Sequence, residues 1–61
     1  MTAIIYDLRN ATRIRVENVE QIRAEQTKMN GRLTNVWFMY IESGKHRSFP
    51  QRHYQIERVE K

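Results

Sequence analysis

The sequence of 61 residues contains no cysteine, one proline and two glycines. The absence of cysteine excludes disulfide bonds and thiolate metal sites, which small domains often need because their cores are thin. His46 and His53 are the only histidines, and a structural zinc site needs more ligands than these two supply. We therefore expect no metal and no cofactor, and we expect stability to come from packing or from a partner subunit.

Long hydrophobic runs and glycine-rich loops are also missing. The longest wholly apolar run, residues 36–41, has six residues, whereas a membrane span needs about 20. No basic segment precedes an apolar stretch at the N-terminus, so we expect no secretory signal, no membrane contact and a cytoplasmic location. Without a glycine-rich loop, the sequence also lacks the phosphate-binding motifs of nucleotide-dependent enzymes.

Side chains capable of catalysis are not grouped by their spacing. Ser48 and His46 share one face of a strand, but no carboxylate is placed by sequence to orient the histidine. Most acids lie beside a basic residue, as Glu57 does beside Arg58, and this pattern is typical of solvated, paired charges. We therefore predict no catalytic residue, no small-molecule substrate and no enzymatic activity.

Alternating polar and apolar residues predict a mainly β domain that covers residues 1–61. Residues 3–8 and 12–17 alternate at period two and are joined by a short polar link, which predicts a hairpin. The phase of the last segment slips by one residue at Val59, which indicates a β-bulge. Apart from the segment 18–30, the predicted strands are residues 3–8, 12–17, 33–43, 45–49 and 54–60.

The segment 18–30 leaves two architectures open. As a strand it ends at Asn30-Gly31, a dipeptide typical of a two-residue hairpin turn, and we favour this interpretation because the helical apolar stripe is thin. The fold is then a five-stranded antiparallel SH3-like barrel or meander with one short 3₁₀ turn near residues 51–53. As a helix the segment has Asn18 as its N-cap and packs on a sheet of three or four strands, which makes the fold α+β.

Four segments follow one another in a distinctive order: residues 16–22 (VENVEQI), 36–40 (VWFMY), 44–50 (GKHRSFP) and 54–59 (YQIERV). They supply part of a hairpin, an aromatic strand, a glycine-containing turn, a strand that ends in Ser-aromatic-Pro and a last strand of the form Tyr-x-Ile. In this order the chain resembles small SH3-like β-barrel proteins of phages, prophages and mobile elements. The resemblance implies an accessory protein that works by binding, and it assigns no functional residue.

The net charge of +4 comes from the middle of the chain, where Lys28 and Arg32 contribute +2 and residues 44–53 contribute +3, less one charge for Glu42. Residues 1–25 and 54–61 are each balanced, whereas residues 44–53, at one hairpin end, are basic and carry Phe49, with Tyr54 next to them. Basic residues interleaved with aromatic rings suit a phosphate backbone with stacked bases. The candidates for DNA or RNA binding are Lys45, His46, Arg47, Arg52 and His53, with Arg13 and Arg15 in support.

The segment 33–43 is apolar on both faces, which raises a second hypothesis. We expect Val36, Phe38 and Tyr40 to fill the barrel, so the opposite face needs a cover, either residues 18–32 or a partner protein. The candidate interface residues on that face are Trp37, Met39 and Ile41.

Three functional classes therefore stay open. We favour contacts with another protein, from a phage or its host, or with a second copy of this chain. Nucleic-acid binding is the alternative, and a structural domain with no separable activity is the third interpretation.

Overall fold

The structure is a computed structural model that describes residues 1–61, and 74% of these residues lie in β-strands. It contains six strands, one short 3₁₀ helix and no α-helix, so none of its helices has the length and apolar character needed to cross a membrane. The elements are β1 (Thr2–Asp7), β2 (Thr12–Val16), β3 (Val19–Met29), β4 (Arg32–Ile41), η1 (Glu42–Gly44), β5 (Lys45–Pro50) and β6 (Tyr54–Glu60).

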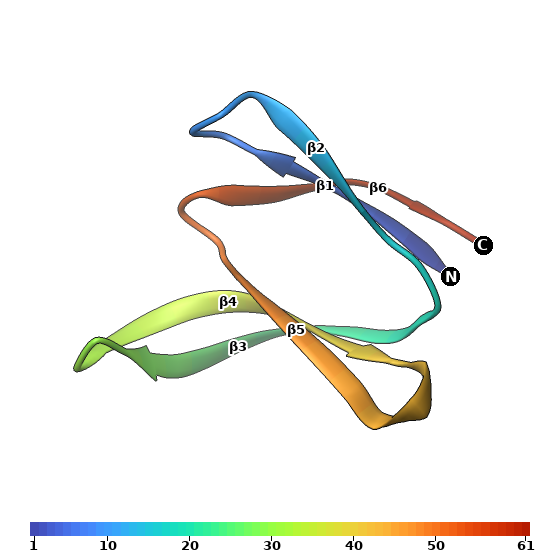
Figure 1. The fold of residues 1–61 in the computed structure, drawn as a ribbon. Helices are drawn as coiled ribbons and strands as arrows, with labels where there is room; N and C mark the ends of the chain where they lie inside the picture. The colour runs from blue at the N-terminus through green and yellow to red at the C-terminus, as the bar shows by residue number, and fades with distance from the viewer.

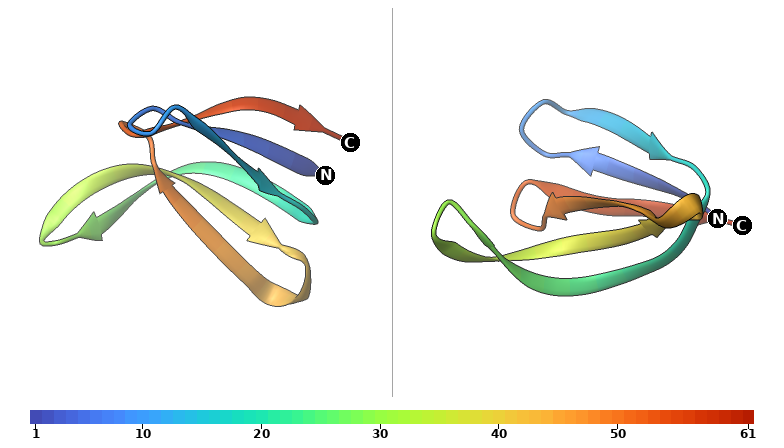
Figure 2. Two further views of the ribbon diagram at one scale, coloured as in Figure 1. Left: turned by 45° about the horizontal axis from the view of Figure 1, so that its top comes forward. Right: turned by 60° about the horizontal axis from the view of Figure 1, so that its bottom comes forward.

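The strands form two antiparallel sheets of three strands each, in the orders β2-β1-β6 and β3-β4-β5. We call them the β1 sheet and the β4 sheet after their central strands. Figure 1 shows the β1 sheet above the β4 sheet, and Figure 2 shows the chain crossing between them from β2 into β3 and from β5 into β6. The principal extents of 34 × 28 × 14 Å fit two thin layers, because stacked sheets pack about 10 Å apart.

The mainly β prediction is confirmed, and the helical alternative for residues 18–30 is wrong because this segment is mostly β3. Asn30 and Gly31 have φ angles of 53° and 78°, the positive values that a type I′ turn requires at both central residues. Met29 and Arg32 pair directly across this turn. The fold has six strands rather than the five of the predicted barrel, because each of the six predicted segments is a strand of its own; between β2 and β3 the chain bends at Asn18, with φ 59°, and passes from one sheet to the other.

The connections agree with the sequence patterns in part. The 3₁₀ helix lies at η1 rather than at residues 51–53, which form a turn in which the His53 amide donates to the Pro50 carbonyl at 3.1 Å. The bulge predicted near Val59 is confirmed, because the pairing of β1 with β6 shifts by one residue between Ile4 and Ile5.

The core lies between the two sheets and is small, as the chain length requires. Only eight hydrophobic residues are buried, and six of them form one cluster to which both sheets contribute. The cluster consists of Ala3, Ile5, Val16, Val19, Met39 and Phe49, with Ile14, Ile22, Trp37, Ile41, Tyr54 and Ile56 half-buried against it.

The face of β4 that packs on the core cluster is the opposite of the predicted one, although Val36, on the predicted face, is also fully buried. Met39 has no exposed surface, and Trp37 and Ile41 pack against the core cluster. Phe38 is only half-buried and Tyr40 is 36% exposed. Of the two covers considered for the Met39 face, a partner protein is therefore excluded, because the chain itself covers this face.

The register of the hairpin between β3 and β4 explains this orientation. Residues directly opposite each other in an antiparallel pair share a face of the sheet. Ile22 lies opposite Met39, whereas Arg23 lies opposite Phe38. Apolar residues of both strands therefore meet on the Met39 face, and that face packs against the β1 sheet.

Asp7, at the end of β1, is the one buried charged residue, with 5% of its surface exposed. Its Oδ1 accepts hydrogen bonds from the backbone amides of Arg9 and Asn10 at 2.9 and 3.3 Å, and its Oδ2 accepts one from Asn10 Nδ2 at 2.9 Å. Burial raises the pKa of Asp7, but these hydrogen bonds and the charge of Arg9 outweigh burial and hold the pKa below its usual value.

The substitution Met39→Ala tests the assignment of the core face. We expect it to reduce the free energy of unfolding by about 2–5 kcal/mol, because it leaves a cavity in a fully buried position. Tyr40→Ala, at the next residue but on the other face, should cost less than about 1 kcal/mol. Urea unfolding followed by circular dichroism measures both, and equal costs would contradict the assignment.

Acid stability tests the role of Asp7. Its pKa is lower in the folded than in the unfolded chain, so the unfolded chain binds more protons as the pH falls. The stabilisation is present above the unfolded pKa, near 3.8, and is lost as the pH falls through the folded value. Between about pH 5 and pH 2, we expect Tm to fall more steeply for the wild type than for Asp7→Asn. Parallel Tm curves would show that Asp7 plays no such part.

Candidate functional site

The outer face of the β4 sheet, turned away from the core, carries a row of aromatic rings. Tyr40 pairs directly with His46 of β5, and Phe38 precedes Tyr40 by two residues on the same face. The rings of Phe38 and His46 are stacked, with centroids 5.0 Å apart and an interplanar angle of 17°, and the Phe38 and Tyr40 centroids are 4.8 Å apart. We call these three residues the aromatic row; Tyr40 and His46 are exposed.

A buried position supports one end of the aromatic row. Val36 lies two residues before Phe38 on the same face of β4 and is fully buried, although it does not belong to the core cluster. Its cross-strand neighbours are Glu25 and Pro50, and its carbonyl accepts a hydrogen bond from Gln51 Nε2 at 3.3 Å. The row therefore stands on a packed part of the sheet rather than on a frayed end.

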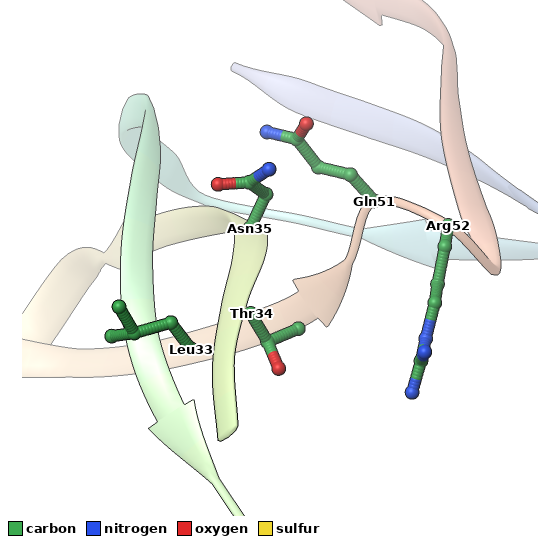
Figure 3. A pocket seen from close by; sticks show the side chains of 5 residues that line it. All are labelled: Leu33, Thr34, Asn35, Gln51 and Arg52. Atoms are coloured by element: carbon green, nitrogen blue, oxygen red, sulfur yellow. The ribbon is translucent and has the colours of Figure 1, made fainter.

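Beyond Val36 the outer face continues into an open groove toward the hairpin tip. β5 ends at Pro50, which leaves the start of β4 without a strand partner on that side, apart from a backbone bond from the Gln51 amide to the Asn35 carbonyl at 2.9 Å. Figure 3 shows a hollow at this place, in which Thr34 and Arg52 point to one side and the amides of Asn35 and Gln51 to the other. A second hollow shares Thr34 and Arg52 with it, and we call this second one the arginine groove; it is lined by Met29, Asn30, Arg32, Thr34, Pro50 and Arg52.

Positive charge predominates on this face. Arg32 and Arg52 form none of the four ion pairs of the structure. Arg23, opposite Phe38, pairs with Glu25 at 3.5 Å, and their side chains are 54% and 32% exposed, so this pair is weak. Three arginines therefore stand against one glutamate, which favours an anionic ligand.

The basic residues predicted at the hairpin end are divided between the two faces of the sheet. His46 lies on the outer face in the aromatic row, whereas Lys45 and Arg47 lie on the other side because successive side chains of a strand alternate. The guanidinium of Arg47 lies 5.0 Å from the centroid of the Phe49 ring. Residues 45–47 therefore do not form one continuous basic rim.

The remaining basic candidates of that hairpin end also separate. Arg52 is exposed and lines the arginine groove. His53 is half-buried, and its backbone is engaged twice, through its amide to Pro50 and through its carbonyl, which accepts from the Leu8 amide at 2.9 Å. We therefore assign Arg52 to the site and assign His53 to the turn that connects the sheets.

Arg13 and Arg15, the supporting candidates, lie on the β1 sheet and are engaged in ion pairs. Arg13 donates to both carboxylate oxygens of Glu57, at 2.6 and 2.9 Å, and Arg15 pairs with Glu17 at 3.1 Å. The hydrogen bonds between them raise the pKa of Arg13 and lower the pKa of Glu57. These glutamates offset the positive charge that a second anion-binding surface would need.

The rings predicted to stack on bases and the residues predicted to contact a protein both pack in or against the core. Phe49 is 4% exposed and packs edge-on against Tyr54, with centroids 5.3 Å apart, so neither ring forms an open stacking platform. The interface candidates on the core side of β4 are Trp37, Met39 and Ile41.

Sequence reasoning missed Phe38, Tyr40 and Arg32 as site residues, although a usable signal was present. A two-residue turn at Asn30-Gly31 places Arg23 opposite Phe38 and Gln21 opposite Tyr40. Polar partners across the ladder mark the face of β4 that is turned to solvent.

No family model, no curated protein and no solved structure matches this chain. The structure also contains no group of three or more His, Asp or Glu side chains that could hold a metal ion. The function must therefore be inferred from the chemistry of the outer face.

Proposed function

We propose that this chain is a non-enzymatic module that binds single-stranded nucleic acid on the outer face of the β4 sheet. The observation that supports it best is the exposed aromatic row, which shares its face with Arg32 and Arg52 in the arginine groove. Aromatic rings stack on unpaired bases, and cations track the phosphates between those bases. The overall charge of +4 adds a long-range attraction to a polyanion.

The shape and length of the face favour a single strand over a duplex. Bases in a duplex are stacked on each other and offer no free ring face to the aromatic row. From Arg32 to Tyr40 the strand rises by roughly 26 Å, at about 3.3 Å per residue. That length accommodates several nucleotides, within the range of about 4–16 that small β-barrel domains cover.

The two ends of the face have different tasks under this proposal. Bases stack on Phe38, Tyr40 and His46, while phosphates lie in the arginine groove, where the Asn30 side-chain amide adds a hydrogen-bond donor. Contacts to phosphates set position and affinity without reading sequence. We therefore expect little discrimination between sequences of the same length.

Protein contacts, favoured from the sequence, now rank second. Their candidate residues Trp37, Met39 and Ile41 pack in or against the core. Tyrosine and arginine are common at protein interfaces, so the outer face could also receive a protein. The excess of arginine over glutamate on this face favours the polyanion.

We also propose that the two sheets are the halves of a partly open SH3-like barrel. Two observations support this proposal. The chain bends at Asn18 and continues from β2 of one sheet into β3 of the other, and the Val19 amide at the start of β3 donates to the Met1 carbonyl beside β1 at 2.8 Å, which links the two sheets. A phage or mobile-element origin, a cytoplasmic location and the lack of enzymatic activity stay predictions.

Truncating the aromatic row should weaken binding without changing its salt dependence. We expect Phe38→Ala and Tyr40→Ala each to cost about 1–3 kcal/mol of binding free energy, which is about 5- to 150-fold in Kd. Fluorescence anisotropy with a labelled oligothymidylate measures Kd, and circular dichroism checks that each variant is folded. Unchanged Kd values in both folded variants would refute stacking on this face.

Neutralising the arginine groove should instead change the salt dependence. Each phosphate contact on a single strand contributes about 0.7 to the slope of log K against log salt. We expect Arg52→Gln to reduce the slope by about this amount. Arg15→Gln removes the same charge from the β1 sheet and should leave the slope nearly unchanged. Equal slopes for the two variants would mean that only net charge matters.

A further inference from the structure

The free edge of β3 has the pattern of a strand that can pair with a copy of itself. From Gln21 to Met29, β3 is an edge strand that pairs only with β4, whereas at its start Val19 also exchanges backbone hydrogen bonds with Met1, at 2.8 and 2.9 Å. Because Met29 and Arg32 close a two-residue turn, the odd-numbered residues of β3 direct their backbone amides and carbonyls toward β4. The even-numbered residues from Ile22 to Lys28 direct theirs to the open side.

We propose that two copies of this chain form a dimer through antiparallel pairing of their β3 edges, with Ala24 of one copy opposite Ala24 of the other. In this register Arg23 of each copy lies opposite Glu25 of the other copy. Ile22 lies opposite Gln26, and Glu20, at the bulge at the start of β3, comes beside Lys28 of the second copy. Opposite charges directly across a ladder stabilise the pairing of strands.

Charge selects this register from its neighbours. Only the even-numbered residues offer free backbone groups, so an even-numbered residue of one copy must lie opposite an even-numbered residue of the other. The nearest alternative registers are therefore centred on residue 23 or on residue 25. Moving the centre to residue 23 places Arg23 opposite Arg23, and moving it to residue 25 places Glu25 opposite Glu25. Like charges directly opposite are destabilising, so the register centred on Ala24 is favoured over both.

The existing contacts of β3 permit this pairing. The ion pair of Arg23 with Glu25 within one chain is 3.5 Å long and partly exposed, so the two side chains can turn toward the second copy at little cost. Charged residues often protect an edge strand from association. Here the charges of Arg23 and Glu25 protect the edge from other strands, but they attract each other when a second β3 lies antiparallel to the first.

The dimer has a geometric consequence for the outer face. Antiparallel edges related by a twofold axis perpendicular to the sheet join into one continuous six-stranded sheet. Both aromatic rows then lie on the same side of that sheet. The pairing depends only on β3 and forms whether or not the outer face binds nucleic acid.

Charge reversal tests the register directly. Sedimentation equilibrium over a range of concentrations should show wild-type mass rising from one chain to two. Arg23→Glu alone and Glu25→Arg alone each place like charges opposite each other, and we expect each to weaken the dimer by about tenfold or more. An equimolar mixture of the two variants should dimerise again, because each chain then meets charges of the other sign. A mixture that stays monomeric would refute the register.

Ala24→Pro provides a test that leaves the fold in place. Its amide points to the open side of β3, so proline removes no bond of the β3–β4 ladder and is tolerated at a sheet edge. We expect a folded monomer by circular dichroism at every concentration. A wild type that stays at the mass of one chain, or an Ala24→Pro variant that dimerises as the wild type does, would overturn the proposal. Oligonucleotide binding, measured on Ala24→Pro, tests the proposed function separately.

Discussion

The two-residue turn at Asn30-Gly31 sets the register of β3 against β4, and the arrangement of both surfaces of the β4 sheet depends on that register. Side chains alternate with a period of two, so a slip by one residue would move every side chain of a strand to the other face. With the observed register, Ile22 meets Met39 in the core and Arg23 meets Phe38 outside. One short turn thus decides which aromatic rings are buried and which are exposed.

Ion pairing divides the basic residues into two groups with different consequences. On the β1 sheet, Arg13 and Arg15 are matched by glutamates, and Arg58 pairs with Glu60 at 3.3 Å. On the β4 sheet, Arg32 and Arg52 keep their charge free beside the aromatic row. These two unpaired cations lie beside the aromatic row, which gives a polyanion a place where charge and stacking coincide.

The thin core links stability to association. A chain this short buries only about 60% of the surface that its unfolded form exposes, and it has no disulfide to compensate. The two open sheets also leave edge strands with unpaired backbone groups, of which β3 is the longest at 11 residues. Anything that binds only the folded chain adds to its stability, so pairing at this edge would stabilise the fold as well as enlarge its surface.

The sequence by itself determined the local structure: the mainly β class, the hairpin turn at Asn30-Gly31 and the bulge near Val59. These features arise from alternation and from backbone preferences of neighbouring residues, which can be read without knowing the rest of the fold. Only the tertiary structure decided which face of β4 is inside, because residues 36–41 are apolar on both faces. It alone decided which cations are free, because Arg13 and Glu57 lie 44 residues apart and no local pattern connects them.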